Sequence, residues 1–260
     1  MSENFQNKNN QRRQMLKGGA ALVGSALLGP LASEAQAEPA TVELPFANGK
    51  RLLATYPEKR PLIVLTSRPP QLETPFEVFN HGLITPNDAF FVRYHHSAIP
   101  TSIDGDKHVI NISGSACAKP FQLTVAQLRS QFKPIEYLAV NQCSGNSRGH
   151  FNPRVTGGQL SNGAMGNARW VGVPLKDVLA RAEIKDSARQ VVFNGLDFPI
   201  FGGGDFVKSL NVQHAMDGEV MLAYEMNGTD IPTLNGYPVK LIVPGYYGTY
   251  WIKHLSDIEV

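Results

Sequence analysis

The sequence contains little cysteine and little net charge, and each shortage excludes a class of protein. Its two cysteines, Cys117 and Cys143, are too few for a disulfide scaffold. The whole chain carries a net charge of +2, and residues 1–37 alone account for it with four cations against two carboxylates. The remainder is therefore close to neutral and predicts no basic surface for nucleic acid or an anionic membrane.

The sequence also lacks a hydrophobic run that suits a membrane span. The apolar segment from Gly18 to Leu31 is too short, and too rich in glycine and alanine, to cross a bilayer comfortably. It follows Arg12 and Arg13, and the small residues of a signal-peptidase site, 35–37, come after it. We therefore expect residues 1–37 to be a twin-arginine signal peptide that sends a folded protein to the periplasm, without stable membrane insertion.

Residues 38–260 lack an internal repeat, a heptad pattern and a low-complexity tract. They are numerous enough for one substantial core, and we treat them as one domain. Low charge with abundant glycine and proline favours a compact fold with many loops over a helical bundle. Predicted strands outnumber predicted helices and do not alternate regularly with them. The sequence therefore predicts an α+β fold with a mixed sheet rather than a doubly wound one.

Apolar and β-branched runs between turn signals predict the strands. A first helix is predicted to begin after Thr124, whose hydroxyl can cap it. A second is predicted over 175–182, because its apolar residues fall on one face. Residues 38–72 are predicted to form an extended lead-in punctuated by proline, with 61–65 as its ordered part. The predicted strands are 89–96, 108–113, 135–140, 190–193, 221–228, 239–245 and 251–260, with a further helix or strand within 207–215.

The strand predicted over 135–140 opens abruptly into a loop of small polar residues that begins at Asn141. Cys143 lies early in this loop, where a buried strand fixes the backbone, and Arg148 follows five positions later. A thiolate near a cation fits a soft-metal ligand that faces an anionic substrate, or an activated nucleophile. The same cysteine could instead be a small buried hydrophobe.

Two other features carry weak signals. The glycine run 202–204 lacks the spacing and the helix start of a dinucleotide motif, so we predict a flexible loop there. His95 and His96 are adjacent, and on a strand they would point to opposite faces and could not easily share a metal. The histidines of the sequence therefore predict no zinc site.

Several short motifs keep a common order and spacing from about Arg60 to Val260. They are the segments 91–95, 142–148, 163–173, 195–197, 223–228, 236–239 and 243–245. Taken together they resemble the molybdenum-cofactor domain of the sulfite oxidase family. The twin-arginine signal and the segment 163–170 are most similar to bacterial periplasmic sulfite dehydrogenases.

The resemblance implies a molybdenum–molybdopterin cofactor, with Cys143 as the single protein thiolate on the metal. The implied reaction is the oxidation of sulfite to sulfate, with electrons passed to a c-type cytochrome. Arg93 and Arg148 would line the pocket where the oxyanion binds, because paired guanidiniums match its oxygens. The implied catalytic residues are thus Arg93, Cys143 and Arg148. The implied cofactor-binding residues are Arg93, His95, Cys143, Asp197, Asn235, Lys240, Trp251, Ile252 and Lys253.

The sequence departs from the family in its pocket and at its end. Vertebrate-type members carry a tryptophan where this chain has Leu160, and a histidine and an arginine where it has Asn235 and Lys240. In the family, the strand matching 252–260 continues into a catalytic tyrosine and an immunoglobulin-like dimerisation domain. We therefore expect this chain to be a fragment or a short form. A homodimer or a cytochrome heterodimer would require the further region.

Three alternatives remain open from the sequence. The first is a periplasmic molybdopterin reductase of sulfoxides or of another oxyanion, which would share the cofactor. The second is an acyl-transfer enzyme in which Cys143 pairs with His95 or His150. The third is a secreted binding domain with a structural disulfide between Cys117 and Cys143.

Overall fold

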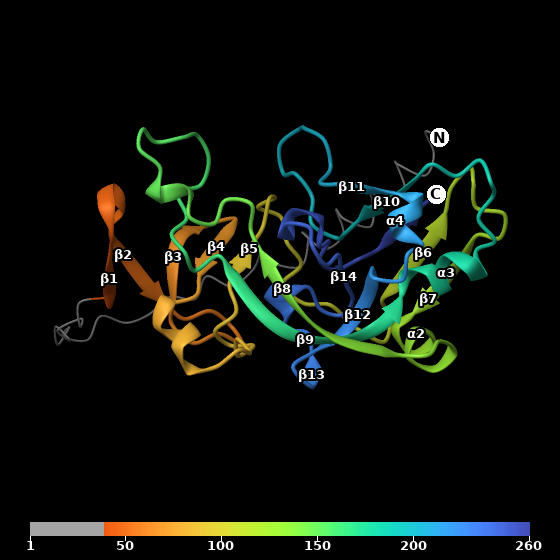
Figure 1. Ribbon diagram of the computed structural model, residues 1–260, viewed down its shortest axis with the longest axis horizontal. Helices are drawn as coiled ribbons and strands as arrows, with labels where there is room; N and C mark the ends of the chain where they lie inside the picture. Colours follow the sequence, from red (N-terminus) through yellow and green to blue (C-terminus); the bar gives the residue numbers. More distant parts are fainter. Residues whose placement is uncertain (1–38) are drawn as a thin grey trace, which may run out of the picture. The chain divides into compact units, whose positions relative to one another are not determined.

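A computed structural model describes residues 39–260 of the protein (Figure 1). The signal peptide predicted over residues 1–37 lies outside these residues. The described chain forms three five-stranded sheets with short helices between them. Strands pair antiparallel except β15 with β6, which are parallel, so the predicted α+β class with mixed sheets is confirmed. Within residues 39–260 no helix has the length and apolar character that a membrane crossing needs.

The first sheet is an antiparallel meander that ends beside the functional site. Its strands, in spatial order, are β1 (Thr41–Leu44), β2 (Gly49–Ala54), β3 (Leu62–Ser67), β4 (Pro70–Glu73) and β5 (Val92–Arg93). The 3-10 helices η1 (Phe46–Asn48) and η2 (Phe76–His81) interrupt it. The strand predicted over 89–96 is wrong in length, because Ala89 and Phe90 donate their amides to Pro86 and Asn87 and so close a turn.

The second sheet has the order β11 (Lys208–Asn211), β10 (Gln190–Asn194), β15 (Asp257–Glu259), β6 (Val109–Ser113) and β7 (Phe121–Thr124). Helix α2 (Val125–Gln131) follows β7, and the predicted cap is confirmed by a hydrogen bond of 3.1 Å from the Gln127 amide to Thr124 Oγ1. The strand predicted over 251–260 is only three residues long. Before it, the backbone pairs elsewhere: Ile252 accepts from Leu241.

The third sheet places the loop that carries Cys143. Strand β8 (Ile135–Gln142) lies at its edge and pairs along its whole length with β9 (Met165–Pro174), as Figure 1 shows. The other strands are β12 (Met221–Met226), β13 (Thr229–Asp230) and β14 (Lys240–Ile242). Because eight residues of β8 are held in register, the first residue after the strand has a fixed position.

The main hydrophobic core joins the second and third sheets around Trp170 and Phe193. Helix α3 (Leu175–Arg181) packs on it with the apolar face that the sequence predicts, and Leu175, Val178 and Leu179 are buried. The segment 207–215, predicted as a helix or a strand, contains both, since β11 runs directly into α4 (Val212–Ala215). The core therefore supports the strand ends on which the site is built.

Candidate active site

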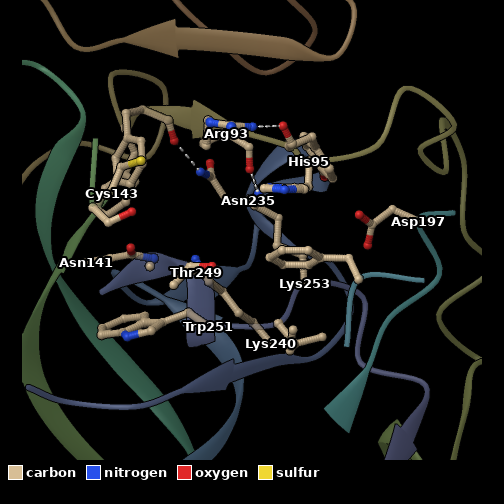
Figure 2. Close-up of a pocket in the computed structure, with 17 residues that line it drawn as sticks. Arg93, His95, Asn141, Cys143, Asp197, Asn235, Lys240, Thr249, Trp251 and Lys253 are labelled. Carbon is tan, nitrogen blue, oxygen red and sulfur yellow. Dashed lines mark hydrogen bonds between the residues drawn. The ribbon is translucent and has the colours of Figure 1, made fainter. Parts of the chain in front are cut away.

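A cavity lies where strand ends from two of the sheets and two short 3-10 helices meet. Figure 2 shows Cys143 and Arg93 on one side of it and Trp251 and Lys240 on the opposite side. Its walls come from segments that are far apart in the sequence. They are Phe90, Phe91, Arg93, Tyr94, His95, Asn141, Cys143, Ser144, Asp197, Phe206, Asn235, Lys240, Gly248, Thr249, Trp251, Ile252 and Lys253.

Cys143 is a free, half-buried thiol directly after β8. Its amide donates to the carbonyl of Ala164 at 2.9 Å, and its Sγ accepts from the amide of Gly145 at 3.4 Å. Cys117 is also free and buried, and its Sγ lies 3.7 Å from the carbonyl of Ala182. The disulfide alternative is therefore wrong, because both cysteines are free and each sulfur has its own partners.

Arg93 is the last residue of β5 and lines the same cavity as the Cys143 thiol. Burial lowers the pKa of Arg93, the charge and hydrogen bond of Cys143 oppose this shift, and the charge of Arg148 adds to it. The guanidinium also donates to the carbonyl of Tyr94. The structure thus brings together the thiol and one of the two arginines that the sequence assigns to the oxyanion.

Arg148 lies near this pair but not in the cavity wall. It opens η3 (Arg148–His150), and its guanidinium lies against two glycines. A Cβ at Gly145 would be 3.1 Å from Nη1, and one at Gly157 would be only 2.5 Å from it. Leu160, at the family's tryptophan position, packs against Gly145 as well. The loop bends back between Cys143 and Arg148, since the amide of Arg148 donates to the carbonyl of Gly145 at 3.0 Å, but the arginine flanks the cavity and does not line it.

Residues from the first sheet hold this loop, and sequence reasoning missed them. Glu73 is 1% exposed, and its Oε1 accepts from the amide of Ser161 at 2.8 Å. Asn48 donates from Nδ2 to the carbonyl of Gly149 at 3.0 Å. Burial raises the pKa of Glu73, and the hydrogen bond from Ser161 opposes the shift. No sequence signal links these positions, because the partners are 88 and 101 residues apart.

The opposite side of the cavity carries buried cations. Lys240 is 1% exposed, and its Nζ lies 4.9 Å from the ring centre of Trp170 and 5.7 Å from that of Trp251. Burial lowers its pKa well below the usual value, and the charges of Lys253 and Lys59 add to the shift. Such a cation is costly to bury without an anion, although the two rings offset part of that cost.

Lys253 and Asp197 form the charged corner of the cavity. Burial lowers the pKa of Lys253 to about 8, although the nearby Asp197 opposes the shift. Its Nζ donates to the carbonyl of Arg93 and lies 3.8 Å from the ring centre of Tyr94. Burial raises the pKa of Asp197, and Lys253 opposes that shift in turn. The lining thus contains one carboxylate against three cations, Arg93, Lys240 and Lys253.

His95 lines the cavity, but the geometry predicted for the histidine pair is wrong. His95 and His96 follow β5 in a bend and are not on a strand. The ring centre of Phe206 lies 4.4 Å from that of His95, which stacks on it, and 6.2 Å from that of His96, which meets it edge-on. Burial and the charge of Arg93 lower the pKa of His95. His150 is bonded to Ser161 Oγ at 3.1 Å. Neither histidine is hydrogen-bonded to Cys143 within residues 39–260, so the nucleophile alternative has no support.

Asn235 lies in η4 (Thr233–Asn235) and is 1% exposed. Its Nδ2 donates to the carbonyl of Phe91 at 3.0 Å, and its Oδ1 accepts from Lys59 Nζ at 2.5 Å. Lys59 stands in the segment that the sequence describes only as an extended lead-in, and was not predicted. Trp251 and Ile252, both predicted, are buried in the lining, and Trp251 Nε1 donates to the carbonyl of Tyr246 at 3.1 Å.

The donor set fits an anionic cofactor that carries a soft metal. Three cations and two side-chain amides lie among the aromatic residues of the lining, and the buried Oδ1 of Asn141 has no partner in the described chain. Within residues 39–260 no three His, Cys, Asp or Glu side chains cluster as a metal site. A metal here would therefore take the Cys143 thiolate from the protein and its other ligands from the cofactor. The cavity defines a metal–cofactor oxidoreductase domain.

Comparisons with known proteins give the family. The oxidoreductase molybdopterin binding domain family matches residues 96–260. Mitochondrial sulfite oxidase of Rattus norvegicus is 35% identical over 211 residues, which cover 78% of this chain and 38% of that protein. The NADH nitrate reductase of Spinacia oleracea is 32% identical over 214 residues, covering 78% and 23%. The chain thus spans well under half the length of these relatives.

A solved structure shares the fold. It is the sulfane dehydrogenase SoxCD of Paracoccus pantotrophus, with a TM-score of 0.65 and 23% identity over 94% of this chain and 58% of that one. The protein belongs to the oxidoreductase molybdopterin-binding domain family, and its fold is of the sulfite oxidase type. Its cofactor is molybdenum–molybdopterin, which the cavity residues fit.

Proposed function

We propose that the protein oxidises sulfite to sulfate and passes the electrons to a c-type cytochrome, in the periplasm after twin-arginine export. The observation that carries the proposal is that the free thiol of Cys143 and the guanidinium of Arg93 line one cavity together with the cations Lys240 and Lys253. Sulfite oxidases at 34–36% identity support it. Sulfite and water give sulfate, two protons and two electrons, and two ferric haems take one electron each.

The cofactor would be held from both sides of the cavity. Cys143 would bind the metal through its thiolate. The remaining cofactor contacts are proposed for His95, Asp197, Asn235, Lys240, Trp251, Ile252 and Lys253, which all line the cavity. When bound, the cofactor supplies the oxygen-atom exchange and the two-electron redox change. Buried lysines suit its anionic groups, because an anion offsets the cost of their own burial.

Arg93 and Arg148 would bind and orient the oxyanion. Arg93 is placed beside the thiol, and a guanidinium can meet two oxygens of sulfite at once. The charge of Arg148 acts on Arg93 from the flanking loop, so both cations attract the same anion. Burial strengthens this attraction, because the local dielectric constant is lower than that of water.

The second candidate is a reductase of nitrate or of a sulfoxide with the same cofactor. The observation that favours it is the identity of 31–34% to plant nitrate reductases. An arginine pair would bind nitrate by the same bidentate contacts. The two candidates differ in the direction in which electrons pass through the site.

The experiment compares both directions on one preparation. Holoprotein of the full natural length, from a host that makes molybdopterin, is mixed with sulfite and ferric cytochrome c. In parallel, a reduced viologen is mixed with the protein and nitrate or dimethyl sulfoxide. We expect cytochrome reduction at two haems per sulfite and little viologen oxidation. A molybdenum-loaded protein that ignores sulfite and oxidises the viologen would establish the reductase instead.

A further inference from the structure

Lys59 is a buried cation beside the cavity to which the proposed mechanism gives no role. It is 5% exposed, and its Nζ donates to Asn235 Oδ1 and to the carbonyl of Asn87, both at 2.5 Å. Both acceptors are uncharged. The two nearby carboxylates make their hydrogen bonds elsewhere: Asp88 with Arg60 at 2.7 Å, and Glu58 with the amide of Thr233 at 2.9 Å. Because both of its hydrogen-bond acceptors are neutral, the buried ammonium of Lys59 keeps most of its positive electrostatic potential.

The contact fixes which end of the Asn235 amide is available to the cavity. A side-chain amide has an acceptor oxygen at one end and two N–H donors at the other. Lys59 occupies the oxygen, and one N–H bonds to the carbonyl of Phe91 at 3.0 Å. The remaining N–H is left without a partner by these two contacts, and Asn235 lines the cavity (Figure 2). Lys59 therefore excludes the flipped amide, whose oxygen would repel an anion.

Lys59 also belongs to a group of mutually repelling cations. Its charge lowers the pKa of Lys240, and the charge of Lys253 lowers that of Lys59. Asp197 faces Lys253, and Glu58 and Asp88 face Lys59 from outside the cavity. An anion inside the cavity would relieve the repulsion among all three lysines. The positive charge of Lys59 would thus stabilise a bound anion without contacting it.

We propose that Lys59 is a positioning residue of the cofactor site, which orients the Asn235 amide as a donor and adds positive field to retain the anionic end of molybdopterin. The inference rests on the cofactor-binding roles proposed above. It does not depend on the substrate, because cofactor retention is measured without turnover.

The charge on Lys59 predicts how retention depends on pH. Burial lowers its pKa to about 7, while Glu58 and Asp88 oppose the shift and Lys253 adds to it. In the cofactor-free protein the ammonium is therefore charged below pH 7 and is lost as the pH rises. A bound anion favours the charged form, so binding takes up a proton and weakens as the pH rises from 6 to 9. Lys253 titrates near 8 and contributes to the same slope.

The test measures the rate at which holoprotein releases its cofactor, from the fluorescence of the freed pterin and the molybdenum that remains bound. Three variants are compared with the wild type. Lys59→Met removes the charge and the hydrogen bonds, Lys59→Arg keeps the charge across the pH range, and Lys107→Met removes an exposed lysine paired with Asp104. We expect release about tenfold faster for Lys59→Met, the scale of one charge-assisted hydrogen bond, and no change for Lys107→Met.

Two further readouts separate positioning from a merely structural role. Lys59→Arg should release its cofactor with a smaller pH dependence than the wild type, which loss of packing would not produce. Because Lys59 acts through Asn235, the double variant Asn235→Leu/Lys59→Met should release its cofactor more slowly than the product of the two single effects predicts, and a full product would contradict the positioning role. Wild-type release by a folded Lys59→Met protein overturns the proposal. If that variant does not fold, an unchanged pH profile in Lys59→Arg overturns it.

Discussion

The cofactor wall of the cavity, formed by Asn235, Lys240, Trp251 and Lys253, differs in burial and in support from the segment from Cys143 to Leu160. We call this segment the loop wall, although only its first residues line the cavity and Arg148 flanks it. The cofactor wall carries the buried Lys240 and the half-buried Lys253. The loop wall is largely exposed after residue 150 and is held by hydrogen bonds from the first sheet. We infer that one wall retains the cofactor and that the other adjusts the substrate.

The largest effect is expected at Cys143, the first residue of the loop wall. Cys143→Ala removes the thiolate proposed to bind the metal, so molybdenum content and activity should both be lost while the chain remains folded. Metal analysis and far-UV circular dichroism check this. Cys117→Ala is the matched control, because that buried cysteine lies outside the cavity lining. Normal molybdenum in Cys143→Ala would remove the thiolate from the metal site.

On the loop wall, Arg148→Gln should weaken oxyanion binding and leave the cofactor in place. Loss of a charge-assisted contact costs about 1.5–3 kcal/mol, or roughly ten- to a hundredfold in kcat/KM, carried mostly by KM. Steady-state kinetics with sulfite give the result. Arg169→Gln is the control, because Arg169 is exposed and lies 3.7 Å from Glu136. Unchanged kinetics in Arg148→Gln would leave Arg93 as the anion-binding arginine of the described site.

The buried carboxyl of Glu73, which supports the loop wall, should make stability depend on pH. Burial raises its pKa in the folded protein, so between the unfolded and folded pKa values the folded state binds more protons. Stability is therefore greatest below the unfolded pKa near 4.5 and falls as the pH rises through the folded value. Glu73→Gln should abolish this fall, which urea unfolding at a series of pH values would measure.

Exposed Glu77 supplies the control for this measurement. Glu77→Gln should keep the wild-type dependence, because its carboxyl is solvated in both states. A wild type whose stability rises with pH above 5 in parallel with Glu73→Gln would contradict the account of Glu73.

The smallest effect is expected far from both walls. Thr124→Ala removes the cap of α2, in which Thr124 Oγ1 accepts from the Gln127 amide. Unfolding free energy should fall by about 1 kcal/mol, with cofactor content and kinetics unchanged. Denaturant unfolding measures the free energy, and the metal analysis and sulfite kinetics described above measure cofactor content and activity. A change in cofactor retention would show that the walls depend on global stability rather than on their own contacts.

The sequence predicts the local features well, because short-range chemistry determines them. The Thr124 cap, the apolar face of α3 and the loop after β8 all follow from neighbouring residues. The sequence does not predict the contacts between residues that are far apart in the chain. Lys59 and Asn235 are 176 residues apart, and no periodicity relates them. The strands predicted over 89–96 and 251–260 are shorter because turns and distant backbone groups take their hydrogen bonds.

Cofactor content and the KM for sulfite, measured on the same preparations of Lys240→Met and Arg148→Gln, test the division between the walls most directly. Lys240→Met should lower the molybdopterin content, while the loaded fraction keeps the wild-type KM. Arg148→Gln should raise KM at full cofactor content. If Arg148→Gln loses as much cofactor as Lys240→Met, or if Lys240→Met raises KM in the loaded fraction, the two walls do not act separately and the account is contradicted.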